Sequence, residues 1–92
     1  MKTPVTKTPL EISLASMPLY EIGRLISKDW VNVNFAARPY LDAMKSLINI
    51  TDNYICDSGS EIVARFLCNA GQYRGETARA IKKELNKRLK NQ

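Results

Sequence analysis

Apolar residues recur at intervals of three and four along most of this chain, and the longest such pattern lies near its C-terminus. Four apolar residues there fall within about 80° of one another on a helical wheel: Ala78, Ile81, Leu85 and Leu89. Such a stripe is typical of an amphipathic helix with one buried side. The pattern predicts a helix over about residues 75–90, in which Glu84 lies four residues before Arg88 and should pair with it.

The same period predicts three further helices, over residues 18–28, 39–50 and 59–69. The first two open on prolines, and the third follows Ser58-Gly59-Ser60-Glu61, which has the form of a capping box. Gly71 stands where a helix-ending glycine is expected, and Gly23 would mark the close approach of another helix. The second helix should bury one apolar face: Tyr40, Leu41, Met44, Leu47 and Ile48.

Two connecting segments carry large apolar residues. Residues 29–37 look extended, and we expect Trp30 and Phe35 to fill the core. The alternative is that this aromatic pair is exposed as a stacking or protein-contact site. The turn at residues 51–57 should point Tyr54 and Ile55 inward.

The N-terminal residues 1–17 read as a flexible, Thr/Pro-rich tail. Thr8-Pro9-Leu10-Glu11 has the form of a capping box and predicts a short helical turn over residues 9–15, although the alternation of apolar residues there also fits a strand. A chain of 92 residues supports one modest core. We therefore expect an all-α fold, a small single-domain bundle of about four helices over residues 18–92.

Charge separates the C-terminal segment from the rest. The chain has 14 basic and nine acidic residues, with a formal net charge of +5. Residues 72–92 hold seven basic residues and two acidic ones, whereas residues 1–71 hold seven of each. All the net charge thus belongs to the last helix and its approach, an arrangement that favours binding of an anionic partner. The alternative is a solvated helix face whose cations interact with the helix dipole.

A helix, a turn containing Gly71 and Gly75, and a basic helix resemble a helix-turn-helix motif in outline. The residue four positions before Gly71 is Leu67, where the motif has a small residue. In this interpretation four residues near the start of the last helix read base edges: Gln72, Arg74, Thr77 and Arg79. Four lysines face phosphates: Lys82, Lys83, Lys87 and Lys90. Tyr73 and Asn86 complete the predicted binding surface.

The competing hypothesis is an adaptor or inhibitor whose basic helix docks on an acidic protein, with Tyr73, Arg74 and Arg79 as its main contacts. A membrane surface is not expected, because the exposed side of this helix has no bulky apolar residues. No run of 18 apolar residues and no signal peptide is present, so we expect a cytoplasmic protein. The oligomeric state is open, with a homodimer among the alternatives.

Catalysis and cofactors are not expected. The chain contains no histidine, which excludes Ser-His-Asp and Cys-His sites, and its four glycines form no phosphate-binding loop. The acidic and amide residues between Asp52 and Glu61 miss the spacing of a calcium loop, so a capped turn is the better interpretation. Cys56 and Cys68 are expected to be buried or half-buried thiols without a metal, and a disulfide between them is possible in principle but not implied.

Two stretches, YRGETARAIKKELNKRLK (73–90) and ARPYLDAM (37–44), resemble small uncharacterised proteins encoded by phages and related mobile elements. The resemblance implies host-directed binding, either to nucleic acid or to a host protein. It implies no particular site residues.

Overall fold

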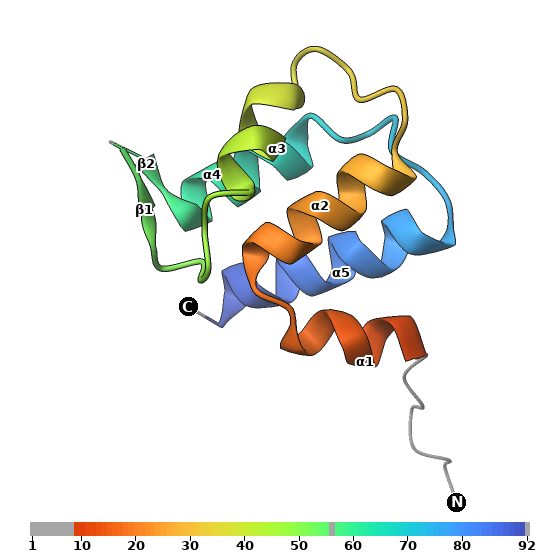
Figure 1. The fold of residues 1–92 in the computed structure, drawn as a ribbon, viewed down its shortest axis with the longest axis horizontal. Helices are drawn as coiled ribbons and strands as arrows, with labels where there is room; N and C mark the ends of the chain where they lie inside the picture. Colours follow the sequence, from red (N-terminus) through yellow and green to blue (C-terminus); the bar gives the residue numbers. More distant parts are fainter. Residues whose placement is uncertain (1–8, 56, 92) are drawn as a thin grey trace, which may run out of the picture.

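The computed structural model describes residues 9–55 and 57–91, and most of them are helical (Figure 1). The elements in chain order are α1 (Pro9–Ser16), α2 (Leu19–Asp29), α3 (Arg38–Met44), β1 (Asn53–Tyr54), β2 (Asp57–Ser58), α4 (Gly59–Cys68) and α5 (Glu76–Lys90). The expected helical class is confirmed. The described residues hold five helices rather than about four, and they add a small antiparallel hairpin that pairs Asn53 with Ser58.

The helices pack in sequence order around one core. In Figure 1, α2 crosses the middle of the molecule, α3 and α4 lie beside it, and α1 lies along α5 at the opposite edge. Contacts join α2 to α3, α3 to α4, α4 to α5 and α5 to α1. Helix α5 also contacts α2, so α5 lies against three helices, whereas α1 is held mainly by α5.

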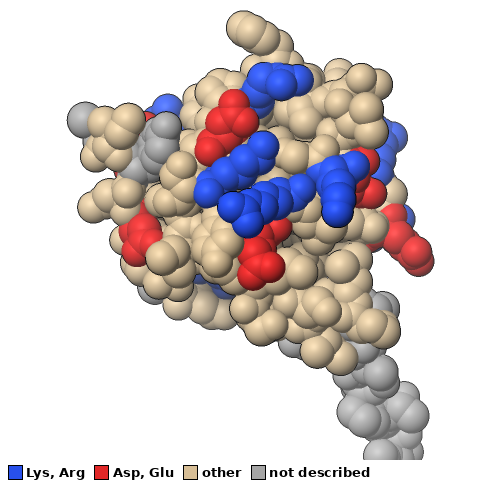
Figure 2. All heavy atoms as spheres, in the orientation of Figure 1, with Lys and Arg blue, Asp and Glu red and all other residues tan. Residues whose placement is uncertain are grey.

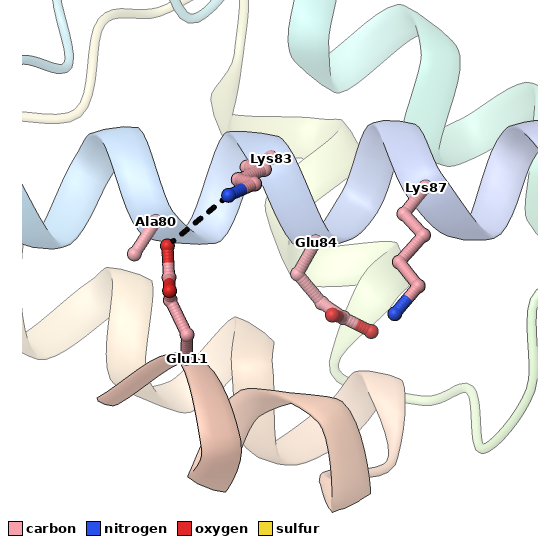
Figure 3. Close-up of a pocket in the computed structure, with 5 residues that line it drawn as sticks. All are labelled: Glu11, Ala80, Lys83, Glu84 and Lys87. Carbon is pink, nitrogen blue, oxygen red and sulfur yellow. Dashed lines mark hydrogen bonds and ion pairs between the residues drawn. The ribbon is translucent and has the colours of Figure 1, made fainter. Parts of the chain in front are cut away.

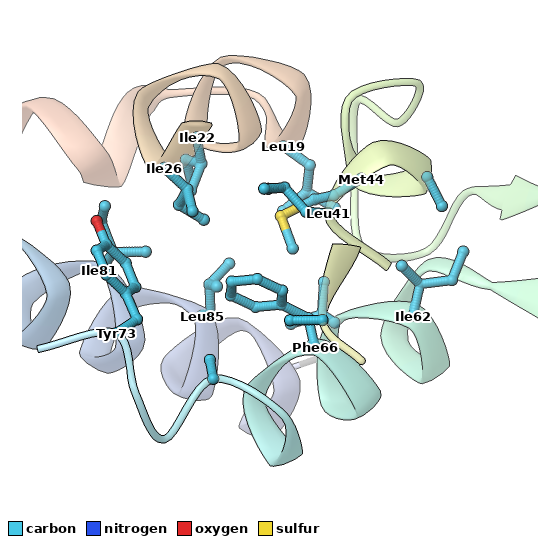
Figure 4. Close-up of a cluster of buried hydrophobic side chains, with 14 of the residues drawn as sticks. Leu19, Ile22, Ile26, Leu41, Met44, Ile62, Phe66, Tyr73, Ile81 and Leu85 are labelled. Carbon is cyan, nitrogen blue, oxygen red and sulfur yellow. The ribbon is translucent and has the colours of Figure 1, made fainter. Parts of the chain in front are cut away.

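Helices α2, α3, α4 and α5 contribute side chains to the core (Figure 4), and α1 adds Leu14. Phe66 of α4 is fully buried, as are Ile22 and Ile26 of α2 and Met44 of α3. The apolar stripe predicted for the last helix is confirmed, since Ala78, Ile81 and Leu85 are buried and Leu89 is partly buried. Burial of such side chains supplies the main free energy that holds a fold of this size together.

The first helix belongs to this core. Residues 9–16 form α1, Leu14 is fully buried, and α1 packs on α5. The helical domain thus includes residues that the predicted division between 17 and 18 assigned to the tail. Residues 1–8, with Thr8 of the predicted capping box, lie outside the described residues.

The helix predicted over residues 39–50 is shorter in the structure, where α3 ends at Met44. The carbonyls of Leu47 and Ile48 accept hydrogen bonds from the first backbone N–H groups of α2, at Tyr20 and Leu19 (2.8 and 2.9 Å). The Asp52 carboxylate accepts from the N–H groups of Ile48 and Asn49 (3.1 and 2.9 Å). Residues 47–49 thus bond to α2 and Asp52 instead of continuing the helix, and Ile48 is exposed rather than buried. Asp52 acts as the cap of a turn, as the sequence indicated.

The predictions for the connecting segments are partly wrong. Trp30 is buried, stacked on Tyr73 at 4.9 Å between ring centroids, but Phe35 is 92% exposed. Ile55, at the tip of the hairpin, is 84% exposed instead of pointing inward. Cys68 is exposed rather than buried, because it faces away from the side of α4 that meets α3 and α5. Cys56 and the side chain of Tyr54 lie outside the described part of the structure.

Among the predictions about helix ends and glycines, those at Ser58 and Gly23 are confirmed and that at Gly71 is wrong. Ser58 Oγ accepts a hydrogen bond from the N–H of Glu61 at 3.2 Å, so the serine half of the capping box is confirmed. Gly71 does not end α4 in the left-handed conformation, which only Gly75 adopts among the described glycines (φ 117°). The close approach predicted at Gly23 is confirmed, since a Cβ there would lie 3.0 Å from Lys45 Cγ, at the end of α3.

Candidate nucleic-acid interface

Helix α5 presents polar and cationic side chains on the side opposite its buried stripe. Five basic or amide side chains are exposed there, and the acidic Glu76 of the first turn is exposed as well; the five are Arg79, Lys83, Asn86, Lys87 and Lys90. We call this set the cationic stripe. At about 1.5 Å per residue it extends roughly 16 Å along the helix. Figure 3 shows Lys83 and Lys87 on α5 above α1. These five predicted site residues are therefore brought together on one accessible face.

One acidic residue of α1 contacts the stripe. Lys83 Nζ lies 3.5 Å from Glu11 Oε2, and the Lys83 side chain is 69% exposed (Figure 3). Exposed pairs of this kind contribute at most about 1 kcal/mol, so Lys83 can exchange Glu11 for another anion at small cost. Sequence reasoning missed Glu11 because it lies 72 residues away and meets α5 only when α1 folds onto it.

Tyr73 is buried, whereas the predicted binding surface called for an exposed side chain. It is 2% exposed, its ring stacks on Trp30, and its hydroxyl donates to Asp29 Oδ2 at 2.8 Å. Burial raises the pKa of the Tyr73 hydroxyl above its usual value, and the hydrogen bond and charge of Asp29 raise it further. Tyr73 therefore supports the turn into α5 from inside.

The side chain of Lys82 lies at the turn before α5, apart from the row of the other three lysines. Its Nζ donates to the carbonyl oxygen of Tyr73 at 2.7 Å and lies 5.9 Å from the Tyr73 ring centroid. Burial, and then the nearby charge of Arg74, lower the pKa of Lys82. The ammonium group is thus held at the turn, beside Arg74, instead of extending freely from the helix.

A hollow of about 270 Å³ lies where the turn meets α5. Three cationic residues, Arg74, Arg79 and Lys82, line it, and none of the described lining residues is acidic. The remaining lining residues are Gly71, Tyr73, Gly75 and Ala78. We call this the turn hollow. It shares Arg79 with the cationic stripe, so the two form one continuous cationic surface. Like charges without an intervening anion repel one another, and an anion placed among them relieves this repulsion.

The residues assigned to base edges are arranged less favourably. Gln72 and Arg74 are exposed, but Thr77 is half-buried and lines a separate hollow between α1 and α5. Because α1 lies along α5, the start of α5 is covered on one side. A recognition helix in the major groove contacts base edges mainly with its N-terminal residues. The geometry therefore favours contacts with a backbone over reading of bases.

Arg88 makes contacts within the fold and is not part of the cationic stripe. The predicted pair is confirmed, with Arg88 Nε at 2.6 Å from Glu84 Oε2. The same guanidinium donates to the carbonyls of Leu14 and Met17, at 2.9 and 2.7 Å. These carbonyls lie at the end of α1, so Arg88 fastens α1 to α5. The helical spacing predicted the first contact, but only the tertiary structure brings the carbonyls within reach.

Comparisons with protein-family models, curated proteins and solved structures give no match to this chain. Within the described ranges, no helix is long and apolar enough to cross a membrane. The same residues contain no cluster of three or more His, Cys, Asp or Glu side chains that could hold a metal ion. The functional argument therefore depends on the geometry of the cationic surface.

Proposed function

We propose that the protein binds nucleic acid through α5 and the turn before it, mainly by contacts with phosphates. The observation that carries this proposal is the turn hollow, where Arg74, Arg79 and Lys82 converge with no acidic lining residue among those described. Guanidinium and ammonium groups are the usual protein partners of phosphate oxygens. A phosphate in the hollow would reduce the repulsion among these three cations.

The cationic stripe extends the surface beyond one phosphate. Lys83, Lys87 and Lys90 continue from Arg79 along the exposed side of α5. A row of cations matches a polymer with a charge on every unit, and its affinity comes largely from released counterions. Binding of this type depends little on base sequence.

An acidic protein partner would use the same cations, since carboxylates also pair with Arg and Lys. The hollow between α1 and α5 would receive such a partner, but its lining has two acidic residues, Glu11 and Glu76, beside Arg79 and Lys83. This balance of charge does not favour an acidic segment there, so nucleic acid is the preferred hypothesis.

Fluorescence anisotropy of labelled duplex and single-stranded oligonucleotides, at about 50 to 200 mM salt, tests the proposal. The variant is Arg74→Glu with Arg79→Glu, since both side chains are exposed. The control is Arg65→Glu on α4, compared with the single variants Arg74→Glu and Arg79→Glu, each of which changes the net charge by the same amount. We expect the variant to lose most of its affinity. The slope of log affinity against log salt concentration should fall by about two, one for each lost phosphate contact, and the control should bind as the wild type does.

Circular dichroism confirms that both variants are folded. Wild-type binding that is absent at low salt, or affinity that falls equally in variant and control, contradicts the proposal. In that case the cationic surface would be assigned to an acidic protein partner, tested directly by titrating labelled poly-glutamate with the wild type and the Arg74→Glu/Arg79→Glu variant.

A further inference from the structure

Carbonyl oxygens of the turn before α5 hold two cations at the turn hollow. Lys82 Nζ donates to the carbonyl oxygen of Tyr73 at 2.7 Å, and Arg74 Nε donates to that of Gly71 at 3.4 Å. Burial first, and then the charge of Arg74, lower the pKa of Lys82, so these two cations are close enough to interact. With Arg79, which lines the same hollow, three positive charges surround one space of about 270 Å³.

Small residues keep this space accessible. Gly71, Gly75 and Ala78 form part of its lining. No atom lies within 4 Å of the place that a Cβ would take at Gly71 or at Gly75, so the space beside both glycines is open. A phosphate group is compact and has several acceptor oxygens, so it can accept hydrogen bonds from different cations around one hollow.

The number of cations indicates which kind of phosphate suits the hollow. A phosphodiester inside a strand carries one negative charge. A phosphate monoester at the end of a strand carries about −1.5 to −2 at neutral pH and presents three acceptor oxygens. Three cations, with no acidic residue among the described lining residues, match the charge of the monoester better than that of the diester.

The position of the hollow also favours the end of a strand. The cationic stripe begins at Arg79 and continues in one direction along α5, to Lys90. Two acidic residues border the turn elsewhere: Asp29 accepts the hydroxyl hydrogen bond of Tyr73, and Glu76 is the exposed first residue of α5. A strand that continued past the hollow would approach these carboxylates, whereas a strand that ends in the hollow contacts the cations alone.

Another group of basic side chains is less suited to a doubly charged anion. Figure 2 shows Lys and Arg side chains gathered over α2 and the end of α3, with acidic side chains around them. Lys45 at the end of α3 lies 3.7 Å from the Asp42 carboxylate, which offsets part of its charge. No described residue offsets the cations of the turn hollow in this way from within its lining.

We propose that the turn hollow binds the terminal phosphate monoester of a nucleic-acid strand. Arg74, Arg79 and Lys82 donate to its oxygens, and the cationic stripe contacts the phosphodiesters that follow it. The inference rests on the proposed function for the polymer and adds that the protein prefers phosphorylated ends. This preference distinguishes the turn hollow from the stripe, because the stripe contacts only phosphates that every strand has.

The test measures the fluorescence anisotropy of two oligonucleotides of the same sequence, in the single-stranded or duplex form that the wild type binds more tightly. One has phosphates at both the 5′ and 3′ ends, the other has hydroxyls there, and both carry the label on an internal base. We expect the wild type to bind the phosphorylated form roughly tenfold more tightly, because the added charge gains a charge-assisted contact.

Lys82→Gln should remove most of this ratio of affinities, since Lys82 lines the turn hollow and is not part of the stripe. Arg74→Gln, at an exposed position, is a second variant with the same expectation. The matched control is Lys87→Gln, the same substitution on the stripe. It should weaken the binding of both oligonucleotides by the same factor and keep the ratio.

The two proposals fail in different ways. Equal wild-type affinity for the two oligonucleotides, with binding that is still lost in Arg74→Glu/Arg79→Glu, overturns only the terminal phosphate. A ratio that is unchanged in both Lys82→Gln and Arg74→Gln overturns the assignment of that phosphate to the turn hollow. No binding of either oligonucleotide at low salt overturns the proposed function, and the inference with it. Binding of thymidine monophosphate or of a phosphoserine peptide as tightly as the phosphorylated oligonucleotide overturns the end of a nucleic-acid strand as the ligand.

Discussion

The hydroxyl of Tyr73 donates a hydrogen bond of 2.8 Å to the carboxylate of Asp29, which lies 44 residues earlier in the chain. The bond joins the end of α2 to the turn that leads into α5, while the Tyr73 ring stacks on Trp30. The Tyr73 carbonyl in turn holds Lys82 at the edge of the turn hollow. The buried pair of Trp30 and Tyr73 thus fixes the turn that holds Lys82 and leads into the cationic surface.

Substitution Tyr73→Phe removes this bond but keeps the stacked ring. Because the Asp29 carboxylate is exposed to water, we expect a loss of about 1 kcal/mol in the free energy of unfolding, measured by urea denaturation. Affinity for a duplex should be unchanged, since Tyr73 is buried. A large loss of affinity in a folded Tyr73→Phe protein would restore Tyr73 as a contact residue.

The same pair predicts the response to alkaline pH. The pKa of Tyr73 is raised in the folded protein above its ordinary value near 10, first by burial and then by Asp29. Above pH 10 the unfolded chain has lost the phenolic proton while the folded protein keeps it, so this contribution to stability is complete below pH 10 and declines as the pH rises further. Urea denaturation between pH 9 and 11, as approximate limits, should show a smaller decline in Tyr73→Phe than in wild type. An equal decline of the free energy of unfolding with pH in the two proteins would contradict the assignment of this effect to Tyr73.

Arg88 should be the most sensitive charged position. Its side chain is 18% exposed and that of Glu84 12%, and Arg88 also bonds the carbonyls of Leu14 and Met17. We expect Arg88→Met to cost about 3 kcal/mol, because Glu84 and the two carbonyls lose their donor. Arg88→Lys should recover little, since an ammonium group lacks the fork of donors. Lys87→Met is the control and should unfold at nearly the wild-type urea concentration.

Two glycines should respond in opposite ways to alanine. A Cβ at Gly59 would lie 2.7 Å from the carbonyl oxygen of Ile50 and 3.0 Å from that of Asp52, so the backbone must move. We expect Gly59→Ala to cost about 1–3 kcal/mol. At Gly71 no atom lies within 4 Å of the added Cβ and φ is not positive. Gly71→Ala should therefore stabilise the protein, by no more than about 1 kcal/mol in thermal or urea unfolding.

Two isoleucines on adjoining helices test the buried side of α5. Ile81 is fully buried, and Ile81→Asp should abolish cooperative unfolding because a carboxylate would enter the core. Ile12, on α1, is 60% exposed, so Ile12→Asp should change the free energy of unfolding by only about 0.5 kcal/mol. A cooperative transition in Ile81→Asp at the wild-type temperature would contradict the placement of the stripe.

Local periodicity was enough to predict much of this fold. The intervals of three and four located α2, α4 and α5 to within two residues, and the buried stripe of Ala78, Ile81 and Leu85 followed from the helical wheel alone. The pairing of Glu84 with Arg88 and the cap at Ser58 also followed, because both depend on residues three or four apart.

What the sequence could not show are the contacts between distant segments. A pattern of apolar residues does not say that Leu47 and Ile48 bond to α2, which ends α3 early, or that Tyr73 is buried against Trp30 while Phe35 is not. The sequence by itself determined where α2, α4 and α5 form and where the charge lies. Only the tertiary structure decided which cations converge at the turn hollow and which apolar residues remain exposed, because these depend on the packing of helices far apart in the chain.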